Sequence, residues 1–198
     1  TKVMPGDTVM VHHTTITPCQ KEYLLAFHKP AGIVCTTSKI DKNNVIDYLN
    51  FPDRIYPVGR LDKESTGLLL LTNNGQLMDD ILRGSNYHEK EYIVHVNKPI
   101  TDSVLQAMAQ GVPILDTITR PCKIRRMGKD CFYITLTQGL NRQIRRMCEY
   151  FDYRVTSLKR IRIMNIELGS LPVGKWRELT PSEIKTLKNL AQNKGEAE

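Results

Sequence analysis

The sequence of 198 residues has no long apolar run, no paired cysteines and no recognisable metal-ligand spacing. A membrane helix needs about 20 apolar residues in succession, so no membrane-spanning segment is predicted. The five cysteines are odd in number and form no Cys-x-x-Cys pair, which argues against a disulfide framework and favours a reducing cytoplasm. The five histidines form neither a His-Glu-x-x-His motif nor a zinc-finger spacing with cysteine, so we predict no metal site.

Acidic residues are scarce in one part of the chain. Residues 120–164 contain 12 Lys or Arg and three acids, so this segment has a net charge of +9 within a chain of +7. Charge concentrated in this way favours a phosphate-bearing partner such as RNA. A solvated charged face is the alternative that charge alone leaves open.

Strand and helix patterns are interspersed after residue 22. The predicted strands cover 23–28, 33–37, 67–72, 90–96, 117–124, 131–137, 154–163 and 165–169. The predicted helices cover 44–50, 76–84 and 102–110, a segment from 141 to 151, and 181–192. Hairpin-like turns argue against a purely parallel sheet. We therefore predict an α+β fold with a mixed, largely antiparallel sheet flanked by helices.

Capping residues predict where several helices begin and end. Asn141 and Thr180 are expected N-caps, with Glu183 as the capping-box partner of Thr180. Thr101 is expected to cap the helix that ends at Gly111, and Gly84 is an expected C-cap.

Asp62 has an unusual setting in the stretch GRLDKESTGLLLLTNNG, residues 59–75. It stands between Arg60 and Lys63, just before four leucines that predict a buried strand. A partly buried carboxylate needs a cation, because an unpaired buried charge costs several kcal/mol. Arginine suits this role, since its planar guanidinium binds both carboxylate oxygens and favours the ionised form. Asp62 is thus a candidate nucleophile or base, or one half of a structural ion pair.

The segment QGLNRQIRRMCEYF, residues 138–151, is the expected source of that cation. Its apolar residues recur at helical spacing and predict a buried stripe. Three arginines crowd the first turns, where positive charge opposes the helix macrodipole by about 0.3–1 kcal/mol each. Such placement suggests a counter-anion, either a phosphate or a buried carboxylate, although simple surface arginines remain the alternative. These arginines are Arg142, Arg145 and Arg146.

Four stretches together resemble the motifs of the pseudouridine synthases, in the branch named after RsuA. GRLDKESTGLLLLTNNG resembles motif II, HKPAGIV motif I, HEKEYIVHV the Lys-x-Tyr motif and QGLNRQIRRM motif III. The resemblance runs from about residue 24 to 180 in the family's order. Residues 112–124, 138–151 and 160–169 resemble the RluF type, which modifies large-subunit ribosomal RNA.

The resemblance implies a domain organisation and a reaction. It implies the pseudouridine synthase fold, with an active-site cleft across the sheet and residues 16–198 as the catalytic domain. Residues 1–15, with a turn at 5–7 and one strand, resemble the end of an S4-like RNA-binding domain. The implied reaction converts a uridine to pseudouridine in ribosomal RNA, with transfer RNA as a further candidate, and needs no cofactor. We expect a cytoplasmic monomer.

The resemblance also implies roles for individual residues. Asp62 matches the catalytic aspartate, which either attacks the ribose C1′ or removes a proton from C2′. Arg145 matches its arginine partner, and Tyr92 matches a tyrosine that stacks on the base and assists proton removal at C5. We interpret Lys29 in motif I as support for the active-site loop and group it with the substrate-binding residues. The other substrate and RNA contacts are expected from Arg60, Ile144, Arg142 and Arg146.

Three other functions can be compared with the residues. A non-catalytic RNA-binding module would use the basic segment alone and keep Asp62 as a structural partner. A glycoside hydrolase would need a second carboxyl about 5–9.5 Å from Asp62, and Glu64 is the nearest in sequence. A P-loop enzyme is excluded, because no Gly-x-x-x-x-Gly-Lys-Ser/Thr pattern exists in the chain.

Overall fold

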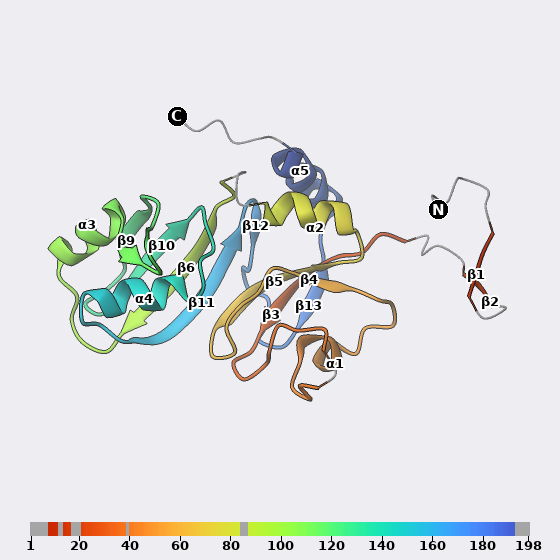
Figure 1. Ribbon diagram of the computed structural model, residues 1–198, viewed down its shortest axis with the longest axis horizontal. Coiled ribbons are helices and arrows are strands. Elements are labelled where there is room, and N and C mark those ends of the chain that lie inside the picture. Colours follow the sequence, from red (N-terminus) through yellow and green to blue (C-terminus); the bar gives the residue numbers. More distant parts are fainter. Residues whose placement is uncertain (1–7, 12–13, 17–20, 39, 84–86, 193–198) are drawn as a thin grey trace.

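The computed structural model describes residues 8–11, 14–16, 21–38, 40–83 and 87–192 (Figure 1). The helices in these ranges are α1 (Val45–Leu49), α2 (Gly75–Leu82), α3 (Asp102–Gln110), α4 (Gln143–Tyr150) and α5 (Pro181–Gln192). The strands are β1 (Val9–Val11), β2 (Thr14–Ile16), β3 (Leu24–Lys29), β4 (Tyr56–Val58), β5 (Thr66–Thr72), β6 (Lys90–Val96), β7 (Pro113–Ile114), β8 (Thr117–Ile118), β9 (Lys123–Arg126), β10 (Cys131–Leu136), β11 (Val155–Ile163), β12 (Ile166–Glu167) and β13 (Trp176–Glu178).

Nine of these strands form one mixed sheet. Its main order is β13-β3-β5-β11-β6-β10-β9, with β4 beside β5 and β12 beside β11. The β5–β11 pair is parallel and every other pair in this sheet is antiparallel. The predicted α+β class with a largely antiparallel sheet is therefore confirmed.

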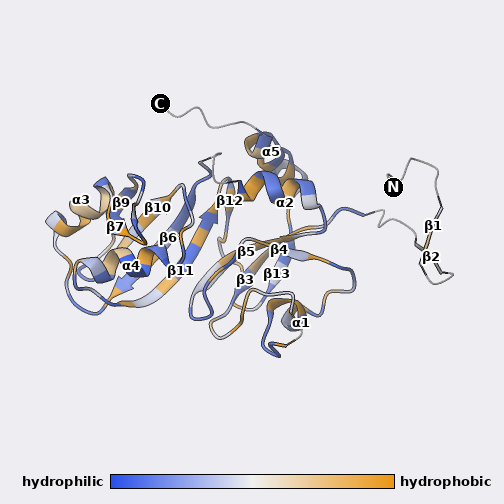
Figure 2. Cartoon of the chain, in the orientation of Figure 1, coloured by the Kyte–Doolittle hydropathy of each residue, from blue (hydrophilic) through white to orange (hydrophobic). Residues whose placement is uncertain are grey.

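Three hydrophobic clusters hold helices on the sheet. The first packs α3 and α4 against β6, β10 and β11. The second packs α2 and α5 against one face of β3 and β5, and the third packs α1 against their other face. The buried leucines of β5 alternate between the second and third clusters, as the period of a strand requires. Figure 2 shows hydrophilic and hydrophobic residues together on α2 and α5, as expected for helices with one buried face.

The two halves of the sheet join where β5 runs parallel to β11. In this short ladder Thr66 pairs with Lys159 and Gly67 with Arg160. Gly67 has φ +107°, and a Cβ there would meet the carbonyl oxygen of Arg160 at 2.1 Å. The Arg160 side chain is buried, and its Nε donates to the Leu68 carbonyl at 2.7 Å while Nη1 reaches the Arg60 carbonyl at 3.4 Å. Arg160 thus binds backbone carbonyls on both sides of Asp62.

Most of the predicted elements are confirmed, and two predicted strands are corrected. Residues 33–37 form no ladder, since Val34 makes only an isolated bridge to Asn44. The predicted strand at 117–124 is split, because Pro121 cannot donate to a ladder. Its first part pairs with β7 and its second part with β10. The sequence reading missed β13 and β7, which are too short to show a clear alternation.

The predicted helix caps are correct at two helices and wrong at a third. Thr101 and Gly111 bound α3, and Thr180 exchanges hydrogen bonds with Glu183 at the start of α5. The N-cap of α4 is Arg142 rather than Asn141, because the Asn141 side-chain oxygen accepts from Arg146 instead. The C-cap of α2 is Arg83, and the predicted cap Gly84 lies outside the described residues.

The N-terminal part contains two short strands rather than the single predicted one. β1 and β2 pair antiparallel in a sheet of their own (Figure 1). The predicted turn at residues 5–7 lies outside the described residues. Within the described ranges, none of the helices combines the length and the apolar character that a bilayer crossing requires.

The β5–β11 junction gives a stability prediction. Replacing Gly67 by Ala adds a methyl group against the Arg160 backbone at a positive φ. We expect the free energy of unfolding to fall by about 1–3 kcal/mol or more, measured by thermal and urea unfolding. The matched control is Gly75→Ala, because a Cβ at Gly75 meets no atom within 4 Å. Equal stability of the two variants would show that the junction tolerates a side chain.

Candidate active site

Asp62 begins a tight turn between β4 and β5. The backbone N–H of Ser65 donates to the Asp62 carbonyl at 3.0 Å, which closes a turn over residues 62–65. Leu61, just before the turn, is buried in the cluster under α1. Ser65, at its end, is also fully buried. The Asp62 side chain stays 29% exposed, so the carboxylate stands on a rigid support at the edge of solvent.

The side chain of Lys29 binds backbone carbonyls of this turn. Its side chain is fully buried, and the ammonium donates to the carbonyls of Pro30, Lys63 and Ser65 at 2.7, 3.3 and 2.9 Å. Gly32 adds a backbone hydrogen bond to the Lys63 carbonyl at 2.8 Å. Burial lowers the pKa of Lys29, while nearby Cys35, Asp62 and Glu64 oppose that shift. The expectation of support for the loop fits this geometry. The grouping of Lys29 with RNA-binding residues stays a prediction, and the buried ammonium does not support it.

The first turns of α4 bring arginines to Asp62. Arg142 precedes the helix with left-handed backbone angles, φ 50° and ψ 34°, a conformation that costs a non-glycine residue about 1–2 kcal/mol. The Arg145 Nε lies 3.4 Å from Asp62 Oδ2, and its Nη2 donates to Ser65 Oγ at 3.1 Å. The Nε is close enough for an ion pair but makes no aligned hydrogen bond to any described residue. The predicted pairing of Asp62 with an arginine from this helix is confirmed.

Arg142 connects the two acids of the turn. Its Nη1 lies 3.4 Å from both carboxylate oxygens of Glu64 and 3.8 Å from Asp62 Oδ2. The pKa of Glu64 is lowered, first by a hydrogen bond from its own backbone and then by Arg142 and Arg145, against the opposing effect of burial. Glu64 is thus favoured as an anion next to Arg142. A general acid would need a protonated carboxyl, so this geometry argues against the glycosidase alternative.

Tyr92 lies at the seam between the two halves of the sheet. It packs against both the cluster under α4 and the cluster that contains Leu61. It pairs with Arg160 across β6 and β11, and the Arg160 Cζ lies 6.0 Å from the centre of its ring. This aromatic ring is therefore tied to the Asp62 segment through the same arginine that binds Arg60 and Leu68.

Sequence reasoning missed three polar residues of this region. Ser65 receives the Arg145 hydrogen bond, and Arg160 spans the Asp62 segment. Lys90 lies two residues before Tyr92 and so on the same face of β6. Burial, together with the charge of Arg160, lowers the pKa of Lys90 to about 8. Lys90 belongs to the Lys-x-Tyr motif and could have been found there. No sequence signal marks Arg160.

The remaining predicted residues occupy different positions. Ile144 is buried in the cluster under α4, and Arg60 is exposed. Arg146 folds back on Asn141, with Nε 3.0 Å from its backbone oxygen and Nη2 3.2 Å from its side-chain oxygen. The expected counter-anion is therefore present for Arg142 and Arg145 but not for Arg146 among the described residues.

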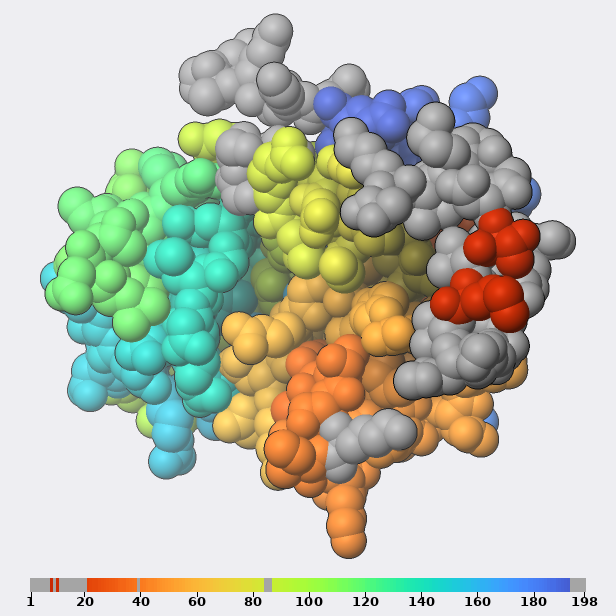
Figure 3. Space-filling view, turned by 45° about the vertical axis from the view of Figure 1, so that its right-hand side comes forward, coloured from red at the N-terminus to blue at the C-terminus, as the bar shows by residue number. Residues whose placement is uncertain are grey.

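The space-filling surface is hollowed between α4 and the Asp62 segment. Figure 3 shows this recess between the teal residues of the α4 half and the orange and yellow residues of the other half. An ionised carboxylate beside a guanidinium, with an aromatic ring near by, can act as a nucleophile or a base. A separate cavity of about 230 Å³ is lined by Glu89, Pro121, Cys122, Lys123, Thr135 and Thr137, and it shares no residue with the Asp62 site.

Comparisons with known proteins agree with this arrangement. The model of the RNA pseudouridylate synthase family matches residues 23–150. The dual-specificity RNA pseudouridine synthase RluF of Escherichia coli K12 is 50% identical over 194 residues, which cover 97% of this chain and 67% of that protein. Ribosomal large subunit pseudouridine synthase B of Bacillus subtilis is 33% identical over 201 residues, covering 97% and 82%. The crystal structure of a pseudouridylate synthase superposes with a TM-score of 0.79 at 28% identity, covering 94% of this chain and 83% of that one. The chain therefore belongs to the RNA pseudouridylate synthase family of isomerases.

Proposed function

We propose that this chain converts a uridine of large-subunit ribosomal RNA to pseudouridine, with transfer RNA as a second substrate to be tested. The observation that carries the proposal is the Asp62–Arg145 pair at 3.4 Å, standing on a turn held by Lys29. Support for the substrate comes from two relatives, one named for dual specificity and one for the ribosomal large subunit.

The proposed reaction moves a uracil without a redox step. The bond between uracil N1 and ribose C1′ breaks, the uracil turns, and its C5 joins C1′. C5 loses its proton and N1 gains one, so that the product is an isomer of uridine. Asp62 either attacks C1′ or removes the C2′ proton, and each route requires an ionised carboxylate. Arg145, whose Nε lies 3.4 Å from Asp62 Oδ2, is proposed to hold the carboxylate in place.

Tyr92 is the proposed partner of the base. Its ring provides a stacking surface, and its hydroxyl is proposed to assist removal of the C5 proton. Ile144 lies directly before Arg145 on the buried side of α4 and would pack beside the uracil. Arg60 is exposed next to the turn and is proposed to occupy the space that the flipped base leaves in the RNA.

The target nucleotide must leave its stack before it can react. Base flipping costs a few kcal/mol, which contacts between basic side chains and phosphates can offset. Arg142 has a partly exposed side chain at the mouth of the site, and Arg146 is one turn further along α4. We propose that both contact the RNA backbone, whereas loop shape determines which uridine is chosen.

The whole set of proposed catalytic groups comes from one chain, which supports a monomer as the active unit. Residues 16–198 are the proposed catalytic domain, and the family match over residues 23–150 supports this assignment. The assignment of residues 1–15 to an S4-like domain stays a prediction. A ribosomal RNA substrate would place the reaction in the cytoplasm.

The proposed function is tested first by pseudouridine mapping with Asp62→Asn. This change keeps the size of the side chain but removes its charge. We expect turnover to fall by at least roughly 100-fold, with RNA affinity near that of the parent, measured by pseudouridine mapping and filter binding. The control is Asp116→Asn, which changes an exposed acid and should leave turnover unchanged. Full pseudouridylation by Asp62→Asn would instead favour the non-catalytic RNA-binding module.

The role of Lys29 is tested by Lys29→Met, which keeps the approximate length of the side chain and removes the ammonium. Three carbonyls lose a charged donor, so stability should fall by about 1.5–3 kcal/mol or more. The catalytic rate should drop because the Asp62 turn loses its support, while RNA affinity stays constant. Lys63→Met, at an exposed position in the same turn, is the matched control. A specific loss of RNA affinity in Lys29→Met would support its assignment as an RNA contact.

The RNA contacts of α4 are tested by the salt dependence of binding. Arg142→Gln and Arg146→Gln should each weaken RNA binding and reduce the slope of log affinity against log salt by about 0.7–0.9. Arg145→Gln should abolish turnover and leave that slope unchanged, because its side chain is only 11% exposed. Equal slopes in all three variants would rule out phosphate contacts by Arg142 and Arg146.

A further inference from the structure

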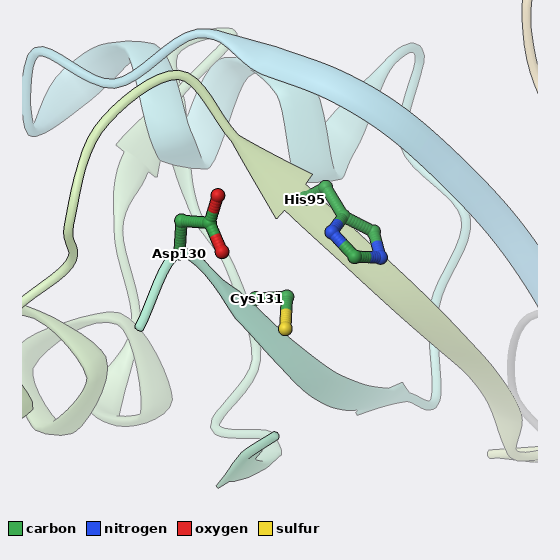
Figure 4. A group of neighbouring side chains, drawn as sticks. All are labelled: His95, Asp130 and Cys131. Atoms are coloured by element: carbon green, nitrogen blue, oxygen red, sulfur yellow. The ribbon is translucent and has the colours of Figure 1, made fainter. Parts of the chain in front are cut away.

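A histidine, an aspartate and a cysteine converge at the end of β6 and β10, away from Asp62. His95 and Cys131 are direct partners across the antiparallel β6–β10 pair, and Asp130 precedes Cys131 in the chain. One ligand atom from each residue lies within 4.8 Å of the other two. Figure 4 shows these three side chains grouped on the neighbouring strands β6 and β10.

The backbone fixes where these three side chains start. Val96 donates to the Asp130 carbonyl at 2.9 Å, and the N–H groups of Met127 and Gly128 both donate to the Cys131 carbonyl at 3.0 Å. A Cβ at Gly128 would lie 2.8 Å from the Cys131 sulfur. The turn before β10 thus closes directly over the thiol and leaves room for it only because residue 128 is a glycine.

The three side chains make no polar side-chain contacts in the described part of the chain. None of them takes part in a hydrogen bond or an ion pair with another described residue. The thiol is buried, the imidazole is partly buried and the carboxylate is exposed. The imidazole and the carboxylate are therefore free to rotate toward a common ligand beside the thiol.

We propose that His95, Asp130 and Cys131 bind one divalent cation of the zinc class. Imidazole nitrogen, thiolate sulfur and carboxylate oxygen are the three ligand types that zinc takes from proteins, with bonds of about 2.0–2.3 Å. Ligand atoms within 4.8 Å of one another need only small side-chain rotations to meet at those distances. Water completes the fourth position on the exposed side. Binding releases the proton of the Cys131 thiol to solvent, because the thiolate is the ligand.

The ion would fasten the ends of two strands without entering the Asp62 site. His95 lies three residues from Tyr92 on β6, so the two side chains point to opposite faces of the sheet. The bound ion would therefore link β6 to β10, and binding of the ion does not depend on the proposed reaction. The sequence gives no sign of it, because sheet register rather than close sequence spacing brings His95 to Cys131.

The test is a titration of the metal-free, reduced full chain with Co²⁺, a coloured substitute for Zn²⁺. We expect one equivalent to bind, with a thiolate-to-cobalt absorption band that Zn²⁺ abolishes by displacement. Zn²⁺ should also raise the unfolding temperature, since a ligand that binds the native state stabilises it. Failure to bind either ion would overturn the proposal and leave the pseudouridine synthase assignment untouched.

Variants identify the ligands. Cys131→Ser should remove the thiolate band, and His95→Ala and Asp130→Ala should weaken binding by at least about tenfold. Cys122, whose thiol is partly exposed, and Cys19, the first cysteine of the chain, provide the controls. Cys122→Ser and Cys19→Ser should bind as the parent does, and circular dichroism of each metal-free variant checks its folding. A thiolate band that survives in Cys131→Ser but disappears in either control would show that the ion binds elsewhere.

Discussion

The pairing of Asp62 with Arg145 depends on a turn that several hydrogen bonds hold in place. The carboxylate reaches the guanidinium because Ser65 closes the turn, Lys29 binds two of its carbonyls and Arg145 itself binds the Ser65 hydroxyl. The Ser65 bond is local to the turn, whereas the bonds from Lys29 and Arg145 join segments far apart in the chain. The site is therefore a product of the tertiary fold, and the charge pair is its final contact. This explains why a buried lysine stands directly behind an acid that must stay exposed.

The arrangement also explains the left-handed residue before α4. Arg142 adopts an unfavourable backbone conformation just where its guanidinium meets Glu64 and Asp62. Strain of this kind persists where the surroundings fix the residue. Here Gln143 helps to do so, because its side chain accepts from the Leu140 N–H and is itself buried. The turn that starts the helix thus directs two arginines three residues apart, at 142 and 145, toward one pair of acids.

The sequence was sufficient for the outline of the fold and for the centre of the site. Periodicity located the strands around 24–29, 66–72 and 90–96, because buried strands with long apolar runs leave a strong pattern. The rule that a partly buried charge needs a counter-charge predicted an arginine partner for Asp62 from this helix, and the resemblance to the family identified that partner as Arg145. What failed depended on long-range contacts. The sequence indicated that Lys29 supports the active-site loop but not that three carbonyls enclose its ammonium. Asn141 was predicted as a cap, but its side chain binds Arg146 instead. Arg160 carried no signal at all, since its partners are carbonyls contributed by another strand.

The parallel contact between β5 and β11 has a consequence for how the protein becomes active. Its two residue pairs join parts of the chain that are separated by the whole of α2, β6, α3 and β10. The entropy lost in closing so large a loop is not repaid until both antiparallel halves exist to meet each other. We therefore expect the halves to fold before they dock, and the seam that carries Asp62, Arg160 and Tyr92 to form late. An incompletely folded chain would then bind RNA through its basic segment without modifying the RNA. Pseudouridine formation would begin only once the two halves of the sheet have docked.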